Sequence, residues 1–353
     1  MKVIIVGGGG REHALAWKLA QSPEAEEIIC APGNAGTATI GRNVPTSAED
    51  IEGIVTLAKA EGAGLVVIGP EAPLAMGLAD RLEAEGITAF GPKKGAARLE
   101  ASKAFSKELM QEAGIPTAAF GVFENPDEAK SFVRQRGGGW AVKADGLAAG
   151  KGVLICPDPA SAELAISEIM ENRAFGEAGE RCVVEEFLEG EEASLLAFVD
   201  GETAVLMPSA QDHKPIGEGD TGPNTGGMGA YSPAPVMTPE LEARAMREVI
   251  EPTVRALAKL GTPYKGILYA GLMIKDGDFK VLEFNCRFGD PECQPLLMRM
   301  DSDLLPVLIA CATGNLANAV VSFSVEPAAC VVMAAGGYPG DYRKGDVISG
   351  LNE

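Results

Sequence analysis

Apolar runs and amphipathic helical segments alternate over the first hundred or so residues of the chain. Lys2 to Val6 forms a short apolar run, glycines follow it, and Leu15 and Leu19 then recur at helical spacing. The same alternation predicts strands over residues 27–31 and 65–68, and helices over 11–22, 46–61 (opened by the capping box Thr46-x-x-Glu49) and 74–85. A strand, helix, strand order predicts a parallel sheet covered by helices, up to about residue 100.

The pattern changes after a helix expected over Lys103 to Ala113 and a break at Gly114-Ile115-Pro116. Strands and helices alternate less regularly here, and their lengths predict a small α+β lobe over about residues 119–188. Its expected elements are strands over 119–123, 140–144, 153–156 and 181–187, and helices over 126–136 and 160–171. A hairpin over 193–199 and 203–208, joined at Asp200-Gly201, begins a mostly antiparallel sheet.

Residues 209–237 form a long segment rich in glycine, proline and polar residues. Loops of this length inside compact domains are usually functional or disordered, and the strands that bound it favour an ordered binding loop around Met228 and Tyr231. A helix over 239–260 follows, and strands over 266–275 and 278–285 then meet at Asp276-Gly277. The fold class is therefore α/β and α+β, in several domains. We expect an N-terminal domain over 1–100, a two-lobed domain over 101–326 and the beginning of a third over 327–353.

Composition excludes several classes of function. The chain has 353 residues, 46% of them hydrophobic, and a formal net charge of −20. Such an acidic protein is a poor binder of nucleic acid or of anionic membranes, both of which attract basic surfaces. Any anionic ligand must therefore be held by a local group of cations.

Cysteine usage and the N-terminus point to the cytoplasm. The seven cysteines are scattered and include no Cys-x-x-Cys pair, so neither a zinc site nor a disulfide framework is indicated. The apolar run at the N-terminus is too short for a signal peptide, and no apolar stretch is long enough to span a bilayer. We expect a cytoplasmic protein.

The segment from Trp140 to Val153 carries the first candidate chemistry. Lys143 interrupts an apolar run, which is costly unless the lysine meets an anion or reaches solvent. Gly146, Gly150 and Gly152 leave the backbone free to direct N–H groups at oxygen atoms, as in phosphate-binding nests. A polyphosphate site is one interpretation, and a plain edge hairpin with a solvated lysine is the other.

Glu283 and Asn285 offer a second candidate site. Residues two apart on a strand project from the same face, so these two side chains present oxygen ligands side by side. Such a pair suits magnesium shared with phosphate oxygens. Arg287 follows in the same alternation and could clamp a phosphate.

The first glycine turn also favours a phosphate, although not a dinucleotide. Gly8-Gly9-Gly10-Arg11-Glu12-His13 places His13 where the third glycine of a dinucleotide fingerprint would stand. A helix that begins behind glycines can still bind a phosphate, and Arg11 could add a charge. The loops 32–37 and 69–74 should lie at the same carboxyl edge of the sheet, where ligands of open parallel sheets bind.

These separated motifs together resemble the ATP-grasp ligases, and most closely the glycinamide ribonucleotide synthetase family. The resemblance runs over the whole chain. Motifs shared with the superfamily are Lys143 with its glycine loop, residues 183–194 and Glu283-Phe284-Asn285. Motifs shared with the narrower family are Gly-Gly-Gly-Gly-Arg-Glu-His-Ala near the start, Gly33-Asn34-Ala35-Gly36-Thr37, Gln211-Asp212-His213-Lys214, Asn224-Thr225-Gly226-Gly227-Met228-Gly229 and Arg287-Phe288-Gly289-Asp290-Pro291-Glu292.

The resemblance implies a set of ATP contacts. Lys103 and Lys143 would meet the phosphates beneath a closing flap over residues 146–152. Residues 185–188 would form a hinge that contacts adenine largely through backbone groups. Glu192, or alternatively Glu191, would bind the ribose hydroxyls. The implied nucleotide-binding residues are Lys103, Lys143, Gly150, Lys151, Gly152, Glu185, Glu186, Phe187, Leu188 and Glu192.

It also implies metal, phosphoryl and acceptor contacts. Glu283 and Asn285 would hold Mg²⁺, with Mn²⁺ as an alternative, and Arg287 would steady the transferred phosphoryl group. Arg287, Lys143 and Asp212 would be the catalytic residues. The implied substrate-binding residues are Gly9, Gly10, Arg11, Gly33, Asn34, Gly36, Thr37, Glu71, Asp212, Asn224, Thr225, Gly226, Gly227 and Met228.

The implied reaction is the ATP-dependent ligation of glycine to 5-phosphoribosylamine in de novo purine biosynthesis. It would give glycinamide ribonucleotide, ADP and phosphate through a glycyl phosphate intermediate. We expect a monomer that binds small molecules, and neither nucleic acid nor membrane. The alternatives are another ATP-grasp carboxylate-amine ligase and, more distantly, an NAD-dependent oxidoreductase.

The sequence departs from the resemblance in two places. Many ATP-grasp relatives carry a second carboxylate on the strand before the magnesium strand, where this chain has Tyr269-Ala270-Gly271-Leu272. This leaves open whether one or two metal ions bind. The family also has a fuller C-terminal domain, of which residues 327–353 would be the beginning.

Overall fold

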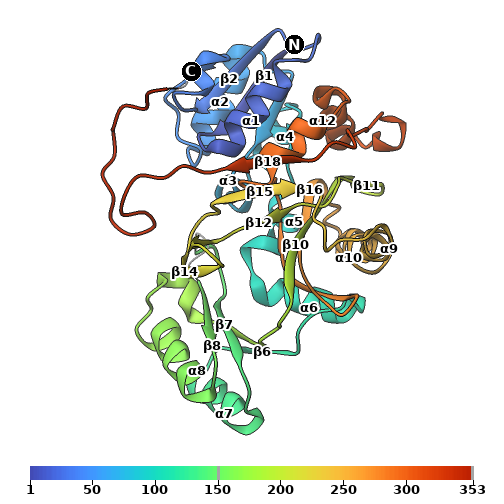
Figure 1. Ribbon diagram of the computed structural model, residues 1–353. Coiled ribbons are helices and arrows are strands. Elements are labelled where there is room, and N and C mark those ends of the chain that lie inside the picture. The colour runs from blue at the N-terminus through green and yellow to red at the C-terminus, as the bar shows by residue number, and fades with distance from the viewer. Residues whose placement is uncertain (149–151, 351–353) are drawn as a thin grey trace.

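The computed structural model describes residues 1–148 and 152–350. Figure 1 shows three regions stacked along the molecule. The N-terminal domain lies at one end, a small lobe with α7 (Pro126–Arg136) and α8 (Pro159–Ile166) lies at the other, and a larger sheet lies between them. The predicted multidomain α/β layout is confirmed.

The N-terminal domain is built on a five-stranded sheet in the order β3-β2-β1-β4-β5. Its strands are all parallel, and the central ones consist of apolar residues buried on both faces, as parallel sheets require. The strands are β1 (Lys2–Gly7), β2 (Glu27–Pro32), β3 (Arg42–Asn43), β4 (Leu65–Ile68) and β5 (Ala89–Phe90). The parallel sheet predicted up to about residue 100 is therefore confirmed.

Two of the predicted N-terminal helices were wrong in extent. The Thr46-x-x-Glu49 capping box is not used: α2 (Ile51–Glu61) begins later, where the Asp50 side chain accepts from Gly53 N–H. The helix predicted over 74–85 is two helices, α3 (Glu71–Met76) and α4 (Leu78–Ala84). Gly77 separates them because it adopts a left-handed conformation, with φ of 95°. The remaining helices up to residue 113 are α1 (Gly10–Leu19), α5 (Lys94–Ala101) and α6 (Lys103–Ala113).

The small lobe, called the lid lobe below, has its own sheet and core. The sheet order is β6-β9-β7-β8, and α7 and α8 pack together against it. Its strands are β6 (Phe120–Phe123), β7 (Trp140–Ala144), β8 (Val153–Cys156) and β9 (Cys182–Glu186), all antiparallel to their neighbours. A π-helical turn over residues 167–171 continues α8, so the predicted helix over 160–171 corresponds to both.

The central sheet has the order β11-β10-β16-β17 and is packed on both faces. Its strands are β10 (Glu191–Asp200), β11 (Ala204–Leu206), β16 (Lys265–Lys275) and β17 (Asp278–Asn285). One face joins the core of the N-terminal domain, α11 (Cys293–Arg299) and α12 (Leu304–Thr313). The other packs on α5, α6 and a long helical segment made of α9 (Pro239–Ala245), a π turn over 246–250 and α10 (Glu251–Lys259).

A bulge in β17 decides which side chains reach each face. The pairing with β16 is regular up to Leu272 opposite Val281, and it resumes with Gly271 opposite Glu283, so Leu282 is an extra residue. Phe279 and Val281 lie in the core before the bulge, and Phe284 lies in the same core after it. Glu283 and Asn285 are thereby placed on the opposite face, which they share with Tyr269.

The segment over residues 209–237 contains short strands. β12 (Gln211–Asp212) pairs with β15 (Gly229–Ser232), which pairs in turn with β18 (Ala328–Val331). Between them β13 (Pro215–Gly217) and β14 (Thr221–Asn224) form a small hairpin. Figure 1 places this hairpin between the lid lobe and the rest of the molecule. Within the two described ranges, no helix is both long enough and apolar enough to cross a membrane.

Candidate functional site

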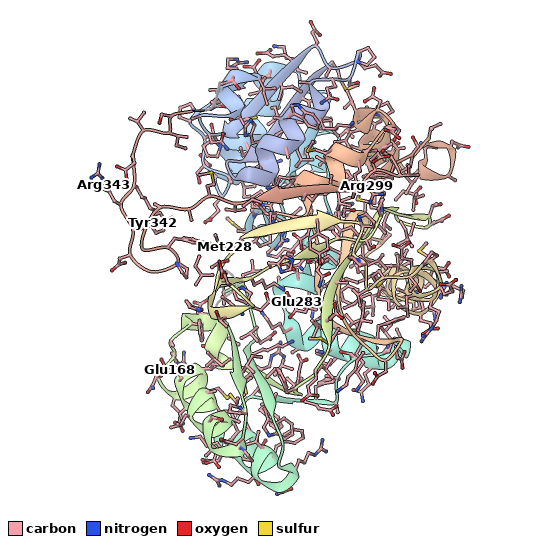
Figure 2. All side chains as sticks on the ribbon, in the orientation of Figure 1. Glu168, Met228, Glu283, Arg299, Tyr342 and Arg343 are labelled. Carbon is pink, nitrogen blue, oxygen red and sulfur yellow. The ribbon has the colours of Figure 1, made fainter. Side chains whose placement is uncertain are left out.

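Glu283 lies at the centre of the molecule, between the lid lobe and the N-terminal domain (Figure 2). Burial alone would raise the pKa of its carboxyl group. Four cations outweigh burial and lower the pKa: Lys143, Lys214, Lys103 and Arg287, in decreasing order of effect. They come from β7, the segment after β12, the start of α6 and the segment after β17. The fold thus gathers four positive charges around one ionised carboxylate.

Lys143 meets an anion, as its place in an apolar strand predicts. It is buried on β7, and its Nζ lies 2.9 Å from Oε1 of Glu185 on the neighbouring strand β9. The same Nζ donates to the carbonyl oxygen of Leu282 at 3.3 Å. The bulge in β17 therefore also supplies an acceptor for this lysine.

Lys103 and the turn after β7 are connected directly. Lys103 begins α6, and its Nζ donates to the carbonyl oxygen of Gly146 at 3.1 Å, while burial lowers its pKa. Asp145 holds the same turn to α6, because its carboxylate accepts from Ser102 Oγ and from Ala104 N–H, both at 3.0 Å. Gly152 is buried just before β8, whereas the predicted contacts Gly150 and Lys151 lie outside the described residues.

The predicted hinge joins the lid lobe to the central sheet. Glu185 and Glu186 end β9, and the exposed Phe187 and the half-buried Leu188 follow it. The N–H groups of Glu186 and Phe187 already donate to the carbonyl oxygens of Ala119 and Gly139. Adenine would therefore have to meet other backbone groups of this segment.

The two candidate ribose ligands lie at the start of β10. Glu192 is 2.7 Å from Nζ of Lys214, whereas Glu191 is exposed and makes no ion pair among the residues that the structure describes. Lys214 also lies 3.7 Å from Asp212, so it stands between a candidate nucleotide residue and a candidate acceptor residue. Burial would lower the pKa of Lys214, but Asp212, Glu192 and Glu283 together raise it.

Arg287 links the N-terminal domain to the central sheet. Its Nη2 lies 2.9 Å from Glu100 of α5, and its Nε lies 3.4 Å from Glu71 of α3. It also donates to Oδ1 of Asn285 at 3.2 Å. Burial would raise the pKa of Glu71, but Arg287, a backbone hydrogen bond and Arg11 together lower it. Burial dominates at Glu100, whose pKa is raised. The predicted alignment of Glu283, Asn285 and Arg287 is thus present, with two further carboxylates beside it.

The donor atoms at Glu283 and Asn285 fit a magnesium ion that shares its ligands with phosphate. One ionised carboxylate and one amide oxygen are too few for a self-sufficient site, and in residues 1–148 and 152–350 no group of three or more His, Cys, Asp or Glu side chains is placed to hold a metal. Mg²⁺ in phosphoryl-transfer sites usually has one or two carboxylate ligands and takes the rest from water and phosphate oxygens. The pair therefore suits a metal that arrives with ATP.

A hollow of about 370 Å³ lies at the carboxyl ends of β1, β2 and β4. It is lined by Gly7, Gly8, Gly9, Pro32, Pro70 and Asp290, among others. Arg11 lines it too, but its guanidinium is held at 2.6 Å from Glu12 Oε1 and donates to the carbonyl oxygen of Phe288 at 3.1 Å. A direct phosphate contact by Arg11 would require its guanidinium to leave these partners.

The predicted loop 33–37 packs directly on the glycine turn. The Asn34 amide donates to the carbonyl oxygens of Gly8 and Gly9, each at 3.1 Å. Thr37 closes the loop by donating its N–H to Asn34 Oδ1 at 2.9 Å. Gly36 lies against the His13 imidazole, so closely that an added Cβ would come within 2.2 Å of the ring. The loop and Gly9 and Gly10 are brought together as predicted.

Asp212 lies in a buried acidic neighbourhood. Burial raises its pKa to about 6; Lys214 opposes the rise, while Glu292 and Glu192 add to it. Glu292 is itself buried, and its Oε1 accepts from Tyr269 and from Ser194. A carboxyl group that titrates near neutrality can exchange a proton with an amine substrate.

The segment from Asn224 to Met228 lies over the residues that follow Arg287. Met228 N–H donates to the carbonyl oxygen of His213 at 2.7 Å, and Thr225 Oγ1 donates to that of Lys214, also at 2.7 Å. Gly227 is so close to Pro291 that an added Cβ would stand 2.4 Å from the Pro291 Cδ. These contacts connect Asn224, Thr225, Gly226, Gly227 and Met228 to the neighbourhood of Asp212.

Several residues of this site were missed in the sequence. Glu100, Lys107, Asp145 and Glu292 are all buried or nearly so. Glu100 and Lys107 contact the predicted residues Arg287 and Glu185, whereas Asp145 and Glu292 contact Ser102 and Tyr269 beside the site. Lys107 had a signal, because it falls on the buried face of α6, where a lysine needs a partner. Glu292 ends the motif that begins at Arg287, whereas Glu100 had no signal, since its partner is far away in sequence.

Comparisons with known proteins agree with this arrangement. The family model described as phosphoribosylglycinamide synthetase, N domain, matches residues 1–100, and the one described as phosphoribosylglycinamide synthetase, ATP-grasp (A) domain, matches residues 101–293. A phosphoribosylamine–glycine ligase of Allochromatium vinosum is 56% identical over all of this chain and 83% of its own length. One from Brucella melitensis is 54% identical over all of this chain and 82% of its own.

A solved structure is similar over nearly the whole chain. The phosphoribosylamine–glycine ligase of Thermotoga maritima superposes with a TM-score of 0.85 at 35% identity. It covers 97% of this chain and 83% of its own. The likeness therefore extends across the N-terminal domain, the lid lobe and the central sheet.

Proposed function

We propose roles for the residues of this site on the premise that the chain belongs to the phosphoribosylglycinamide synthetase family, whose models match residues 1–293. The protein is an ATP-dependent carbon–nitrogen ligase. It joins glycine to 5-phosphoribosylamine in purine biosynthesis, releasing ADP and phosphate. The observation that supports the residue-level proposal is the group of four cations that together lower the pKa of the buried Glu283 carboxyl group, because such a group could balance the charge of a polyphosphate.

Phosphoryl transfer would need positioning and charge neutralisation more than covalent help. Glycine's carboxylate would attack the γ-phosphorus of ATP, and Lys103, Lys143 and Arg287 would bind the phosphate oxygens. Glu283 and Asn285 would hold Mg²⁺, with Mn²⁺ as an alternative, and the ion when bound would neutralise further phosphate charge. The lid lobe would exclude water from the glycyl phosphate that results.

The acceptor side would use two loops at the carboxyl edge of the N-terminal sheet and the long segment over residues 209–237. The glycine turn at Gly9 and Gly10 and the loop 33–37 would hold the phosphate of phosphoribosylamine through backbone N–H groups. The Gly9 N–H would first have to leave Glu12 Oε2, to which it donates at 2.6 Å. Asp212 would receive the proton that the attacking amine loses, since its pKa lies near 6. Asn224 to Met228 would cover the acceptor from the side of the lid lobe.

The proposal divides the chain by role. Residues 1–100 would bind the acceptor, residues 101–326 would bind ATP and glycine, and residues 327–353 would begin a C-terminal domain. Glu185 to Leu188 would contact adenine, with Glu192 on the ribose. Glu71 would orient Arg287 from the N-terminal domain. The protein would act on these small molecules as a monomer.

Substrate dependence tests the proposed function directly. Phosphate release from ATP should require both glycine and phosphoribosylamine, because ATP is consumed only to activate the carboxylate. Release would be measured with each substrate omitted in turn, and glycinamide ribonucleotide would be identified by mass spectrometry. ATP turnover that does not change when glycine is omitted would contradict the proposal.

A further inference from the structure

Three charged side chains form a buried row at the junction of the lid lobe and α6. Glu185 on β9 stands between Lys143 on β7, 2.9 Å from its Oε1, and Lys107 on α6, 2.7 Å from its Oε2. The exposed fractions of these side chains are 2% for Glu185, 2% for Lys107 and 7% for Lys143. The row therefore holds two positive charges and one negative charge with almost no water.

Lys107 is fixed from behind, on the side of the central sheet. Its Nζ donates to Thr117 Oγ1 at 2.6 Å, and Thr117 donates in turn to the carbonyl oxygen of Val281 at 2.7 Å. Lys107 and Lys143 thus meet different oxygens of the Glu185 carboxylate, and Lys107 is also held by Thr117. A ligand in the cleft can meet Lys143 without touching Lys107.

The two contacts of Glu185 differ in kind. Its Oε1 has no hydrogen-bond partner among the residues that the structure describes, so Lys143 is held there by charge without hydrogen-bond geometry. Coulomb attraction is strong in a site without water. If Lys143 were the sole counter-ion of Glu185, the carboxylate would neutralise its charge and weaken its attraction for phosphate. Lys107 offsets the carboxylate charge, and this leaves a net positive charge on the row.

We infer that Lys107 is a positioning residue for ATP: it neutralises Glu185, so that the charge of Lys143 remains available to the phosphates. The inference deepens the proposed function and rests on the phosphate contact of Lys143. Lys107 itself touches no substrate. Burial lowers the pKa of Lys107 to about 8, with Glu185 opposing the decrease, so the side chain is still mostly protonated at neutral pH.

The experiment is a charge-rescue series read out as ATP affinity. Lys107→Met should weaken binding of ATP with magnesium about tenfold, the loss expected when one charge-assisted contact is weakened. Glu185→Gln keeps the backbone groups through which the hinge would contact adenine and removes only the side-chain charge. The double variant Lys107→Met with Glu185→Gln should therefore recover most of the affinity, since Lys143 then has no competing carboxylate. Dissociation constants would be measured by calorimetry on the whole chain without glycine, and the thermal midpoint of each variant would be recorded.

A purely structural role predicts a different pattern. In that case Lys107→Met would lower the thermal midpoint while leaving the ATP dissociation constant within twofold of the unsubstituted protein, and this would overturn the inference. A double variant that binds ATP no better than Lys107→Met would overturn it as well. If Lys107→Met does not fold, Lys107→Gln takes its place, because its amide can still donate to Thr117: a tenfold loss of ATP affinity that Glu185→Gln restores supports the inference, and an affinity within twofold of the unsubstituted protein contradicts it.

Two further variants separate this inference from the proposed function. Lys130 of the lid lobe pairs with Glu171 at 2.8 Å on the surface, so Lys130→Met controls for the loss of a lysine from an ion pair. Lys143→Ala reports on the phosphate contact itself. Normal ATP affinity in Lys143→Ala would refute the phosphate role of Lys143, whereas a loss there without a loss in Lys107→Met would refute only the inference.

Discussion

The cleft around Glu283 gathers four cationic side chains from four segments, whereas the hollow at the end of β1 is lined by a glycine turn, by prolines and by both charged and small residues, with Arg11 as its one cation among the described residues. Both regions are proposed to hold phosphate. The cationic side chain at the hollow, Arg11, is turned to Glu12 and to the carbonyl oxygen of Phe288. One region would thus bind phosphate with charged side chains, and the other mainly with backbone N–H groups.

The difference follows from what each ligand needs. A polyphosphate that loses a phosphoryl group changes its charge distribution during the reaction, and several separate cations can stabilise that change. A phosphate that serves only as a handle does not change, and a rigid loop can bind it at little entropic cost. Substitutions should therefore act through charge in the first region and through shape in the second.

Loss of Lys143 should have the largest effect. Lys143→Ala is expected to lower kcat/KM for ATP about a hundredfold, or about 3 kcal/mol in the barrier, by analogy with the removal of one preorganised donor. The lid lobe should stay folded, because Lys107 still balances Glu185. Steady-state kinetics and a thermal melt would check both statements. Lys130→Ala is the matched control, and an equal loss in that variant would mean that the effect is not specific to the cleft.

The pH dependence of stability should come next. Asp212 has a folded-state pKa of about 6, above the ordinary 3.8, so the folded protein holds a proton between pH 4 and 6 that the unfolded chain has released. The contribution of Asp212 to stability is therefore present below pH 4 and is lost as the pH rises through 6, by up to about 3 kcal/mol.

The variant Asp212→Asn cannot bind this proton in either the folded or the unfolded state. Its unfolding free energy, relative to that of the unsubstituted protein, should rise between pH 4 and pH 7. Urea unfolding at several pH values would measure the difference. A difference that stays constant over this range would show that Asp212 titrates normally. No comparable trend is expected from the hollow, where shape dominates.

A change of shape at the hollow should have the smallest of the three effects. An added Cβ at Gly8 would lie 2.6 Å from the carbonyl oxygen of Gly33, and neither backbone can yield easily. Gly8→Ala is expected to raise the KM for phosphoribosylamine on the order of tenfold by displacing the two loops, while ATP binding without the acceptor stays normal.

Kinetics with the acceptor varied, and calorimetry with ATP alone, would test this separation. Gly336→Ala is a suitable control, because nothing lies within 4 Å of the Cβ that it would add. An equal loss of ATP affinity in Gly8→Ala would remove the contrast between the two regions.

Much of the fold was predictable because its signals are local. The helix over Lys103–Ala113 and the strand over Trp140–Ala144 have the predicted bounds. The errors in helix bounds arose where two local signals compete. Asp50 caps α2 in place of Thr46, and Gly77 interrupts a helical pattern because it adopts a left-handed conformation. A sequence presents both capping residues and does not say which one is used.

The site was predictable only where a motif carried it. Glu283, Asn285 and Arg287 are close together in sequence, so their alignment could be expected. Glu100 reaches Arg287 from nearly two hundred residues away, and no period or spacing connects them. The helical pattern shows that Lys107 falls on a buried face and needs a partner. The identity of that partner, Glu185, depends on the tertiary fold and could not be predicted.

The bulge at Leu282 makes the chemistry of the cleft depend on the number of residues in β17. Phe279 and Val281 lie in the core, and Glu283 and Asn285 would follow them there if the strand alternated without interruption. Exchanging Leu282 for another apolar residue preserves the number of residues in β17, whereas deleting it would move the side chains that follow to the opposite face of the strand. Evolution can therefore alter the side chain at this position freely, but an insertion or deletion here would exchange the inside and the outside of the site in a single step.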